Sequence, residues 1–449
     1  MTKATNDAFE RAVTDAVAHQ RAGRLRAAQA AYREALNVSP GHPIATHNLG
    51  VVTAALGDHP AAVGHFDRAI AIEPRYASAH YNRAIALAAL GQATQAIESF
   101  SRACAIEPEH YNAHRALGFL WLAEGERGRS LDHFARTYEL RRGDDQTGIA
   151  ARSLTETTRT KLRHDAEQFR YLAARRHDRP RFEVLARTYE DVARDAPQEP
   201  APLSERQREM LGDDYNTAIY LGSAPELADG ALTDRADRDD LVCRFRSGQT
   251  GAVYFDDLLT PQALALLQQY LLESTIWHDF SHIGGFVAAY LEDGLACPLL
   301  LQIADELRKA LPELLGGYPL TQGWAFKAVD PSAAVDVHAD DAAITVNFWV
   351  TPTDANLEPG RGGLAVCRVP PPADWQLEGY EADHERIVTF LGQNAGNTLI
   401  VPYRQNRAVL FDSRLFHSSD LPKFVESYEN HRVSFTLLYG RHVAGASKA

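Results

Sequence analysis

The chain has 449 residues and a formal net charge of −13, from 46 Lys and Arg against 59 Asp and Glu. This length supports two or three domains with cores of their own, and a negative charge without a basic stripe argues against a general nucleic-acid binder. Residues 1–142 hold 16 basic and 14 acidic side chains, so the negative charge belongs to the remainder of the chain.

The spacing of the cysteines and the length of the apolar segments indicate in which cellular compartment we expect the protein. The four cysteines are widely spaced and form no C-x-x-C pair, so we expect neither a disulfide framework nor a structural zinc. The N-terminal MTKATNDAFERAV is polar and lacks the apolar core of a signal peptide, and no apolar run approaches membrane-spanning length. We therefore expect a cytoplasmic protein without a membrane partner.

Residues 9–142 repeat with a period of 34 residues. The residues in register are Gly23, Gly57, Gly91 and Gly125; Ala28, Ala62, Ala96 and Ser130; Tyr32, Phe66, Phe100 and Phe134; and Pro40, Pro74 and Pro108, with Arg142 at the fourth proline position. Each unit reads as two helices, with glycine at the inner turn, the small residue where the helices approach closely, and proline breaking the chain before the next unit.

This pattern resembles a tetratricopeptide repeat (TPR) array, which predicts an α-solenoid superhelix of four repeats over residues 1–142. The resemblance implies a concave face that binds a peptide or a partner protein. A scaffold that only dimerises or solubilises the chain is the alternative. Asn48, Asn82 and His114 lie on the first helices of their units, where such a face would be, but surface polarity explains them equally well.

Residues 143–240 read as a helical bridge between the array and the last domain. Residues 151–176 and 181–196 have helical apolar spacing, and a proline-rich stretch follows them. His164 and Asp165 are adjacent on the first of these helices, where consecutive side chains diverge. We therefore expect them to have solvated or packing roles.

Residues 241–449 read as a domain of strands with flanking helices. Residues 252–257 predict a strand, and a helix follows with Thr260 as its N-cap and Pro261 in its first turn. A second helix is expected over residues 297–316, and further strands over 324–330 and 344–350. Lys327, on the first of these strands, is expected to face a pocket or the solvent.

Two other segments of this domain read as loops near a pocket mouth. Residues 275–294 contain His278 and His282, which we expect to be pocket-edge or structural residues rather than metal ligands. Residues 370–398 look like an insertion, and loops of this kind often carry substrate selectivity.

His338, Asp340 and His417 form the candidate metal site. Residues i and i+2 on a β-strand point to the same face, so His338 and Asp340 can reach one ion together, and His417 would come from a later strand. Two histidines and one carboxylate on one face leave open positions on the metal, which suits Fe(II) that must bind a cosubstrate and dioxygen. Asp341 should point away from the ion by alternation.

The strand-like run RVSFTLLY follows His417 and begins at Arg432. Alternation puts Arg432, Ser434 and Thr436 on one face, where a guanidinium with a hydroxyl two residues on can clamp a carboxylate. An exposed polar face of an edge strand is the other interpretation. Asn347 lies on the polar face of the strand over 344–350 and can help to bind cosubstrate or substrate.

The order H-x-D, distant His, R-x-S resembles the Fe(II)/2-oxoglutarate-dependent dioxygenases, more closely their prolyl-hydroxylase-like branch. The resemblance implies a double-stranded β-helix, or jelly roll, over roughly residues 250–440, within a domain of residues 241–449. It also implies that His338, Asp340 and His417 hold iron, and that Arg432, assisted by Ser434, binds 2-oxoglutarate. Gly362-Gly363-Leu364 resembles the Gly-Gly that opens a middle strand in that branch.

The sequence therefore predicts a multi-domain α + β protein that uses Fe(II), 2-oxoglutarate and O2 to hydroxylate a protein or peptide side chain recruited by the array. Asp340 favours hydroxylation over halogenation, because a halogenase needs that coordination position for halide. An oxygenase of free small molecules, a TPR adaptor with an inactive barrel, and a related metalloenzyme that does not use 2-oxoglutarate remain alternatives. Arg404, Arg407 and Arg414 indicate either an acidic substrate or scattered structural arginines.

Overall fold

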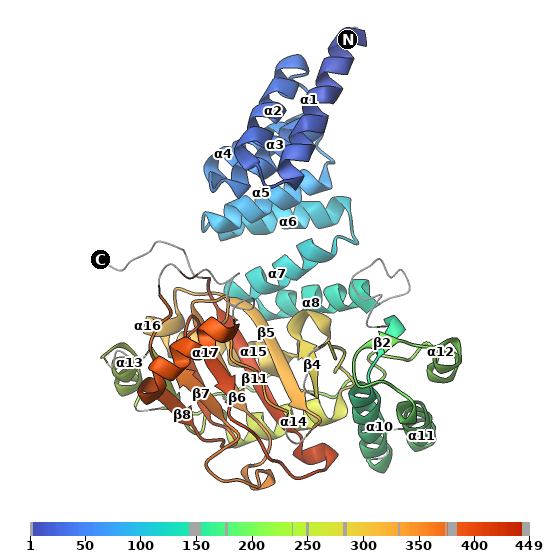
Figure 1. Cartoon of the computed structure of the whole chain (residues 1–449), viewed down its shortest axis with the longest axis vertical. Helices are drawn as coiled ribbons and strands as arrows, with labels where there is room; N and C mark the ends of the chain where they lie inside the picture. Colours follow the sequence, from blue (N-terminus) through green and yellow to red (C-terminus); the bar gives the residue numbers. More distant parts are fainter. Residues whose placement is uncertain are drawn as a thin grey trace. The chain divides into compact units, whose positions relative to one another are not determined.

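The computed structural model describes residues 3–142, 154–175, 178–235, 237–247, 251–281, 285–330, 333–372, 375 and 384–441. The chain divides into two compact units, Met1–Trp121 and Leu122–Ala449 (Figure 1). The domain boundaries predicted after residues 142 and 240 stay predictions. Within the described ranges, no helix has the length and apolar character needed to cross a membrane.

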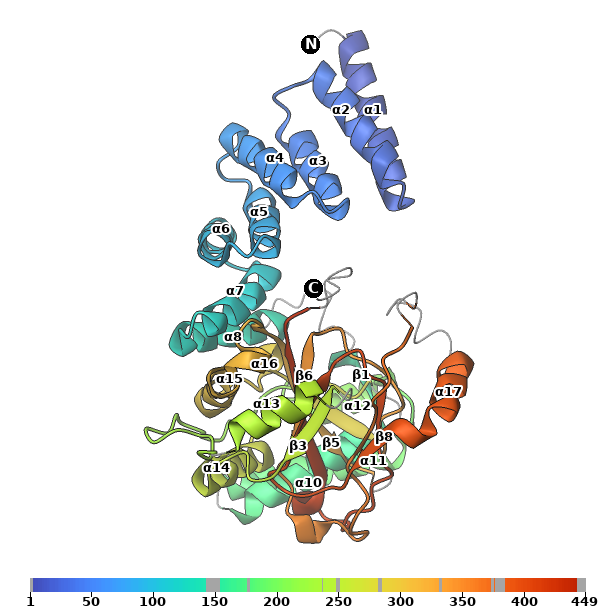
Figure 2. The ribbon, with the colours of Figure 1, turned by 90° about the vertical axis from the view of Figure 1, so that its left-hand side faces the viewer.

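The first unit consists of helix pairs that follow the 34-residue repeat (Figure 2). Its helices are α1 (Lys3–Arg21), α2 (Leu25–Val38), α3 (Pro43–Ala55), α4 (His59–Ile72), α5 (Ala77–Ala89), α6 (Ala93–Ile106) and α7 (Tyr111–Ala123). The repeat glycines lie between the two helices of each pair, with φ of 71° at Gly23, 88° at Gly57, 72° at Gly91 and 81° at Gly125. This left-handed conformation is one that L side chains rarely adopt, so it explains the glycine at every inner turn.

The other repeated positions form the core of the array. Ala62 and Phe66 on α4 are fully buried, as are their counterparts Ala28 and Tyr32 on α2. A Cβ added at Gly50 on α3 would lie 2.7 Å from a ring carbon of Phe66 on α4. The absence of a side chain at Gly50 therefore allows the Phe66 ring to pack directly against α3. The predicted helix pairs are confirmed, and the repeated small and aromatic residues are buried between the helices.

Helix α8 (Arg127–Arg142) completes the fourth repeat and belongs to the second unit. Its Ser130 and Phe134 are buried, as the repeat predicts. Arg127 Nη1 lies 2.8 Å from Asp305 Oδ2, and the buried Arg142 binds Asp293 through Nε at 2.6 Å. The arginine that replaces the fourth proline therefore forms a buried ion pair within this unit.

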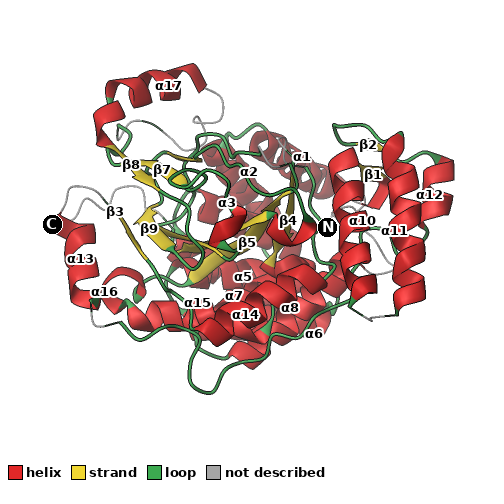
Figure 3. Ribbon diagram, turned by 90° about the horizontal axis from the view of Figure 1, so that it is seen from below, coloured by secondary structure: helices red, strands yellow, loops and turns green. Residues whose placement is uncertain are grey.

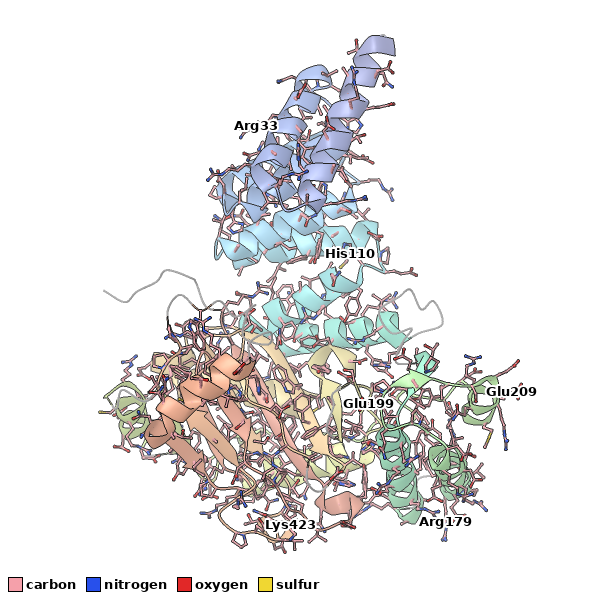
Figure 4. All side chains as sticks on the ribbon, viewed as in Figure 1. Arg33, His110, Arg179, Glu199, Glu209 and Lys423 are labelled. Carbon is pink, nitrogen blue, oxygen red and sulfur yellow. The ribbon has the colours of Figure 1, made fainter. Side chains whose placement is uncertain are left out.

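The region predicted as a helical bridge contains two long packed helices and two short ones within the second unit, and its role as a bridge stays a prediction. Its elements are β1 (Glu156–Thr157), α10 (Arg159–Ala174), α11 (Arg179–Arg194), β2 (Ala201–Pro202), α12 (Glu205–Leu211) and α13 (Arg238–Ser247). Helices α10 and α11 lie side by side next to the sheet region (Figure 3) and share an apolar core that includes Leu162, Phe169 and Tyr189. Arg179 and Glu209 point outward from the bridge (Figure 4).

The rest of the second unit contains two antiparallel sheets with flanking helices. The strands are β3 (Ala252–Phe255), β4 (Phe286–Tyr290), β5 (Leu320–Ala328), β6 (Ile344–Trp349), β7 (Leu364–Cys367), β8 (Thr398–Val401), β9 (Ala408–Asp412), β10 (His417–Ser419) and β11 (Arg432–Tyr439). The helices are α14 (Pro261–Glu273), α15 (Pro298–Ala310), α16 (Pro312–Leu315) and α17 (His384–Gln393), with short 3₁₀ helices at η1 (Leu291–Asp293), η2 (Thr353–Ala355), η4 (Ala395–Asn397) and η5 (Tyr428–Asn430). Helix α14 begins as predicted, because Thr260 accepts from the Ala263 N–H and Pro261 follows it.

One sheet has six strands in the order β3-β9-β6-β11-β5-β4, and the other has three in the order β10-β7-β8. The sheets pack against each other through one apolar cluster, in which Trp349 and Phe411 from the larger sheet meet Val366 and Val401 from the smaller. The predicted antiparallel sheets with helices are confirmed. The described strands form two separate sheets without a closed barrel, so the double-stranded β-helix stays a proposal.

Two segments differ from the sequence prediction. Residues 286–290 form β4, an edge strand of the larger sheet, rather than a loop, because this apolar FVAAY run pairs with β5 along its whole length. His338 lies in an isolated bridge with His417 rather than in a regular strand. His282 and parts of the predicted insertion (373–374 and 376–383) lie outside the described residues.

Lys327 and the bridge helix α10 form a buried polar cluster on the outer face of β5. The prediction that Lys327 faces the pocket or solvent is wrong: alternation turns it away from the pocket, and α10 covers that face, so it is fully buried. Its ammonium lies 4.2 Å from the Trp277 ring centroid and donates to Tyr428 Oη at 3.2 Å.

His164 and Asp165 have the packing role that was one of the two predicted for them, but their side chains meet rather than diverge. His164 Nδ1 lies 2.9 Å from Asp165 Oδ1, because the Asp165 carboxylate turns toward the two neighbours on α10 that can donate to it. Lys161 Nζ, one turn earlier, lies 2.8 Å from the same carboxylate. All three residues are buried, so their role is to fix α10 against the back of the sheet.

The repeat core gives a first prediction. Phe66→Ala removes a fully buried ring from α4 and should lower the unfolding free energy of the array by about 3–5 kcal/mol. Ile72→Ala on the same helix is the matched control, because Ile72 is 40% exposed. Urea unfolding followed by far-UV circular dichroism measures both variants, and equal losses would contradict the packing described.

The buried cluster gives a second prediction. Asp165→Ala leaves the Lys161 ammonium with only the Trp277 carbonyl as partner, and breaking a buried pair in this way should cost about 3–5 kcal/mol of stability. Glu183→Ala is the control, because its partner Arg179 is on the surface and the pair is exposed; it should change stability little. Thermal unfolding compares the two, and an unchanged midpoint for Asp165→Ala would rule out the structural role.

Candidate metal centre

The three candidate ligands come together at the edge of the smaller sheet. His338 and His417 exchange backbone hydrogen bonds in both directions, at 3.0 and 2.9 Å. The Asp340 N–H donates to the Ser413 carbonyl at 2.9 Å. The segment from His338 to Asp340 thus lies against the start of β10, and both of its side chains reach the side where His417 lies.

The ligand atoms are close enough to share one ion. His417 Nε2 lies 3.5 Å from Asp340 Oδ2, and His338 Nε2 lies 3.8 Å from Asp340 Oδ1. One candidate ligand atom from each residue lies within 4.8 Å of the others. Two donors about 2.1 Å from one ion are themselves about 3 Å apart, so a small closure brings all three into a coordination sphere.

Hydrogen bonds around the triad leave the Nε2 atoms of both histidines available to a metal ion. His338 Nδ1 lies 2.8 Å from the Asp336 carbonyl, and His417 Nδ1 lies 3.0 Å from the Leu415 carbonyl. Each carbonyl requires a proton on Nδ1, which leaves the Nε2 lone pair for the ion. Thr345 Oγ1 donates to Asp340 Oδ2 at 2.7 Å and so orients the carboxylate.

Burial differs among the three ligands. The side chains of His417 and Asp340 are 4% and 7% exposed, whereas that of His338 is 38% exposed. Burial, together with the nearby His338, lowers the pKa of His417 to about 4. The His417 imidazole is therefore neutral near neutral pH, so a cation would not have to displace a proton from it.

The back of the metal segment is covered by helix α17. Val337 and Ala339 alternate with the ligands and point the other way, into an apolar cluster with Ile387 and Phe390 of α17 and Phe416 beside His417. Part of the predicted insertion thus packs behind the ligands, a role that its sequence did not indicate. Its predicted role in substrate selectivity stays a prediction.

The predicted cosubstrate residues line the same pocket as the triad. Arg432, Ser434 and Thr436 from β11 and Asn347 from β6 all contribute to its wall. Thr436 Oγ1 donates to Asn347 Oδ1 at 2.7 Å, so this hydroxyl and amide hold each other in place across neighbouring strands. The structure brings all six predicted site residues together.

Arg432 is buried and incompletely paired. It is 3% exposed, and its Nη2 donates to the Gly363 carbonyl at 3.3 Å. Its Nε has no hydrogen-bond partner among the described residues. Burial lowers its pKa to about 10, so the group is still a cation near neutral pH. A buried cationic donor with an unused N–H fits an anionic ligand in the pocket.

Gly363 is needed where Arg432 meets the smaller sheet. A Cβ at this position would lie 1.9 Å from the Val401 carbonyl oxygen, so no larger residue fits. Gly362 has φ of 75°, and β7 starts directly after the pair at Leu364. The predicted Gly-Gly therefore does open a strand.

The remaining candidates lie away from the triad. His278 is buried and its Nδ1 lies 3.2 Å from Asn216 Oδ1, which makes it structural. Arg404 and Arg407 pair with Asp256, and Arg414 pairs with Asp412, so the structural interpretation of these arginines is confirmed. Asp341 is exposed, as predicted.

Comparison with known proteins identifies the first unit. Residues 14–77 and 54–110 match the tetratricopeptide repeat family, so the N-terminal part of the chain carries tetratricopeptide repeats. No curated protein matches the chain. The residues from the metal centre onward lie outside the family match, so the C-terminal unit is defined here by its sheets and its His-Asp-His group.

Similar solved structures cover only part of the chain. MamA from Desulfovibrio magneticus RS-1 is 24% identical with a TM-score of 0.29, over 31% of this chain and 78% of that one. YrrB, a TPR protein with an unusual peptide-binding site, is 17% identical with a TM-score of 0.27, over 29% and 66%. The first TPR of Spaghetti (RPAP3) bound to an HSP90 peptide is 19% identical with a TM-score of 0.26, over 26% and 94%.

The metal centre gives a third prediction. Asp340→Ala should abolish Co(II) binding, and Thr345→Val should weaken it by about 10- to 100-fold, because Thr345 orients the Asp340 carboxylate. Asp341→Ala is the control, since this neighbouring carboxylate is exposed. Isothermal titration with Co(II) measures all three variants, and wild-type affinity in Asp340→Ala would exclude the site.

Proposed function

We propose that the second unit is an Fe(II)- and 2-oxoglutarate-dependent oxygenase that hydroxylates a side chain of a protein or peptide. The observation that carries the proposal is the meeting of two groups in one pocket. One is a His-Asp-His triad with free Nε2 atoms, and the other is a buried arginine with an unused N–H.

In this proposal His338, Asp340 and His417 hold the iron. Bound iron with 2-oxoglutarate supplies the activation of O2, so that one oxygen atom enters a substrate C–H bond and the other enters succinate, with loss of CO2. The protein contributes orientation. Thr345 fixes the Asp340 carboxylate, and the two backbone carbonyls fix the imidazole rings.

Arg432 binds the distal carboxylate of 2-oxoglutarate in the proposed site. Its Nη2 donates to the Gly363 carbonyl, and its Nε has no hydrogen-bond partner among the described residues. The guanidinium group is thus anchored to the protein at one nitrogen and keeps N–H donors for a ligand. Ser434 adds a hydroxyl on the same face of β11, and Asn347 lies opposite Thr436 on β6. In the proposed site one cationic donor, Arg432, and the neutral groups of Ser434 and Asn347 surround the distal carboxylate.

The array supports a polypeptide substrate. Stacked tetratricopeptide repeats form extended concave surfaces that bind other chains, and the family match covers residues 14–110. We assign residues 1–142 to recruitment, 143–240 to the bridge and 241–449 to catalysis.

Anaerobic addition of Fe(II) and then 2-oxoglutarate tests the proposal. The wild type should develop a weak visible charge-transfer band, and Arg432→Ala should weaken 2-oxoglutarate binding by about 10- to 100-fold, the effect of losing hydrogen bonds to a charged group. Arg432→Lys keeps the charge but loses the fork, so it serves as a second variant if Arg432→Ala does not fold. Arg404→Ala is the matched control, because that side chain is 50% exposed and pairs with Asp256. The absence of a band in folded, iron-loaded wild type would exclude the oxygenase.

A further inference from the structure

Four aromatic side chains line the inner face of strands β4 and β5. They are Phe286 and Tyr290 on β4 and Trp324 and Phe326 on β5, and we call them the aromatic shelf. Their ring centroids lie 6.0 Å apart for Phe286 and Phe326, 6.1 Å for Trp324 and Phe326, and 6.3 Å for Tyr290 and Trp324. Contacts of this kind make one continuous aromatic surface rather than four separate rings.

Strand register places this shelf beside the candidate cosubstrate residues. Trp324 lies opposite Thr436, and Phe326 lies opposite Ser434. Residues directly opposite in an antiparallel pair point to the same face, so the shelf and the polar face of β11 share one side of the sheet. Trp324 and Phe326 line the same pocket as the metal triad, and both are half-buried. The shelf therefore extends from the triad toward β4, the last strand of the sheet.

The shelf contains one polar group without a partner. Trp324 Nε1 is buried and makes no hydrogen bond within the described residues. A buried indole N–H usually finds an acceptor. It and Arg432 Nε are the unpaired buried donors among the described residues of this pocket. One is cationic and one is neutral, so the pocket has donors for two different acceptors.

The charges of the pocket indicate what enters beside the iron. Apart from the two histidines, the described residues that line it carry formal charge only at Asp340 and Arg432. In the proposed site the metal takes Asp340 and the cosubstrate takes Arg432, so the rest of the described wall, which includes Trp324, Phe326 and Val335, carries no formal charge. Among the described lining residues, this wall offers no cationic partner for a second carboxylate, and burying such a charge unpaired is costly.

We infer that the aromatic shelf is the substrate subsite, and that it receives an uncharged, mainly apolar side chain within a polypeptide. Trp324 Nε1 donates to a neutral oxygen of that substrate, such as a peptide carbonyl. The inference rests on the proposed function and deepens it: a free amino acid brings a carboxylate for which the described lining has no cation besides Arg432, whereas an internal peptide residue brings no such charge. Trp324 is accordingly a substrate-binding residue.

Two small probes test the subsite in full-length protein loaded with Fe(II) and 2-oxoglutarate under anaerobic conditions. N-acetyl-L-phenylalaninamide carries a neutral amide at each end, and L-phenylalanine has the same side chain as a zwitterion. Ligand-observed NMR measures the dissociation constant of each. We expect the amide to bind at least about tenfold more tightly than the zwitterion. A tenfold loss of affinity is the smallest effect expected when one charge is buried without a partner. Equal or tighter binding of L-phenylalanine, or no binding of either probe, would overturn the inference.

Trp324→Phe keeps a ring in the shelf and removes the N–H. It should raise the dissociation constant of the amide probe about three- to tenfold, as expected for one lost hydrogen bond, and leave that of 2-oxoglutarate unchanged. Trp375→Phe is the matched control, because Trp375 packs in the cluster behind the metal segment. An unchanged amide affinity in folded Trp324→Phe would remove Trp324 from the subsite.

The outcomes separate the two proposals. A wild type that shows the charge-transfer band but prefers the zwitterion keeps the oxygenase and loses the peptide subsite. A wild type without the band loses the oxygenase itself, whichever probe binds. Retained amide preference in that protein would then mean only that the shelf binds neutral apolar groups.

Discussion

Alternation along β5 and β11 is the constraint on which the second unit depends. On one face, Arg432 and Trp324 turn into the pocket with unpaired donors. On the other, Lys327 turns into a dry cluster held by Trp277, Tyr428 and α10. A register slip of one residue would exchange these environments and place a lysine in the pocket and an indole among buried charges. The polar cluster behind the sheet thus helps to fix the register that sets the residues in front of it.

Periodicity and spacing predicted much of the fold. The 34-residue period predicted the helix pairs because the same buried small residue recurs at Ala28, Ala62 and Ala96. Most strands of the larger sheet were also visible as alternating runs. The strand over 286–290 was missed, since its neighbouring glycines and aromatic residues suggested a loop.

The proximity of His338, Asp340 and His417 was predictable from a short motif, a His and an Asp two residues apart with a second His before an R-x-S, and their role as metal ligands stays a proposal. The sequence could not show what supports them. Thr345 orients Asp340 across a turn, and Phe390 packs behind the ligand segment from a helix far along the chain. The burial of Lys327 was missed for the same reason, because a single sequence gives the face of a strand or helix but not which element covers it. Trp324 carried no motif, and only its unpaired nitrogen distinguishes it.

The position of α8 has a consequence for how this chain can vary. Repetition in the sequence runs to Arg142, whereas the compact first unit ends at Trp121. Arg127 and Arg142 of the last repeated helix form ion pairs with Asp305 and Asp293, so this helix is a structural part of the second unit. Repeats toward the N-terminus can be gained or lost without touching these ion pairs. A deletion of all four repeats, although it follows the sequence pattern, would remove a structural helix from the unit that contains the His-Asp-His group.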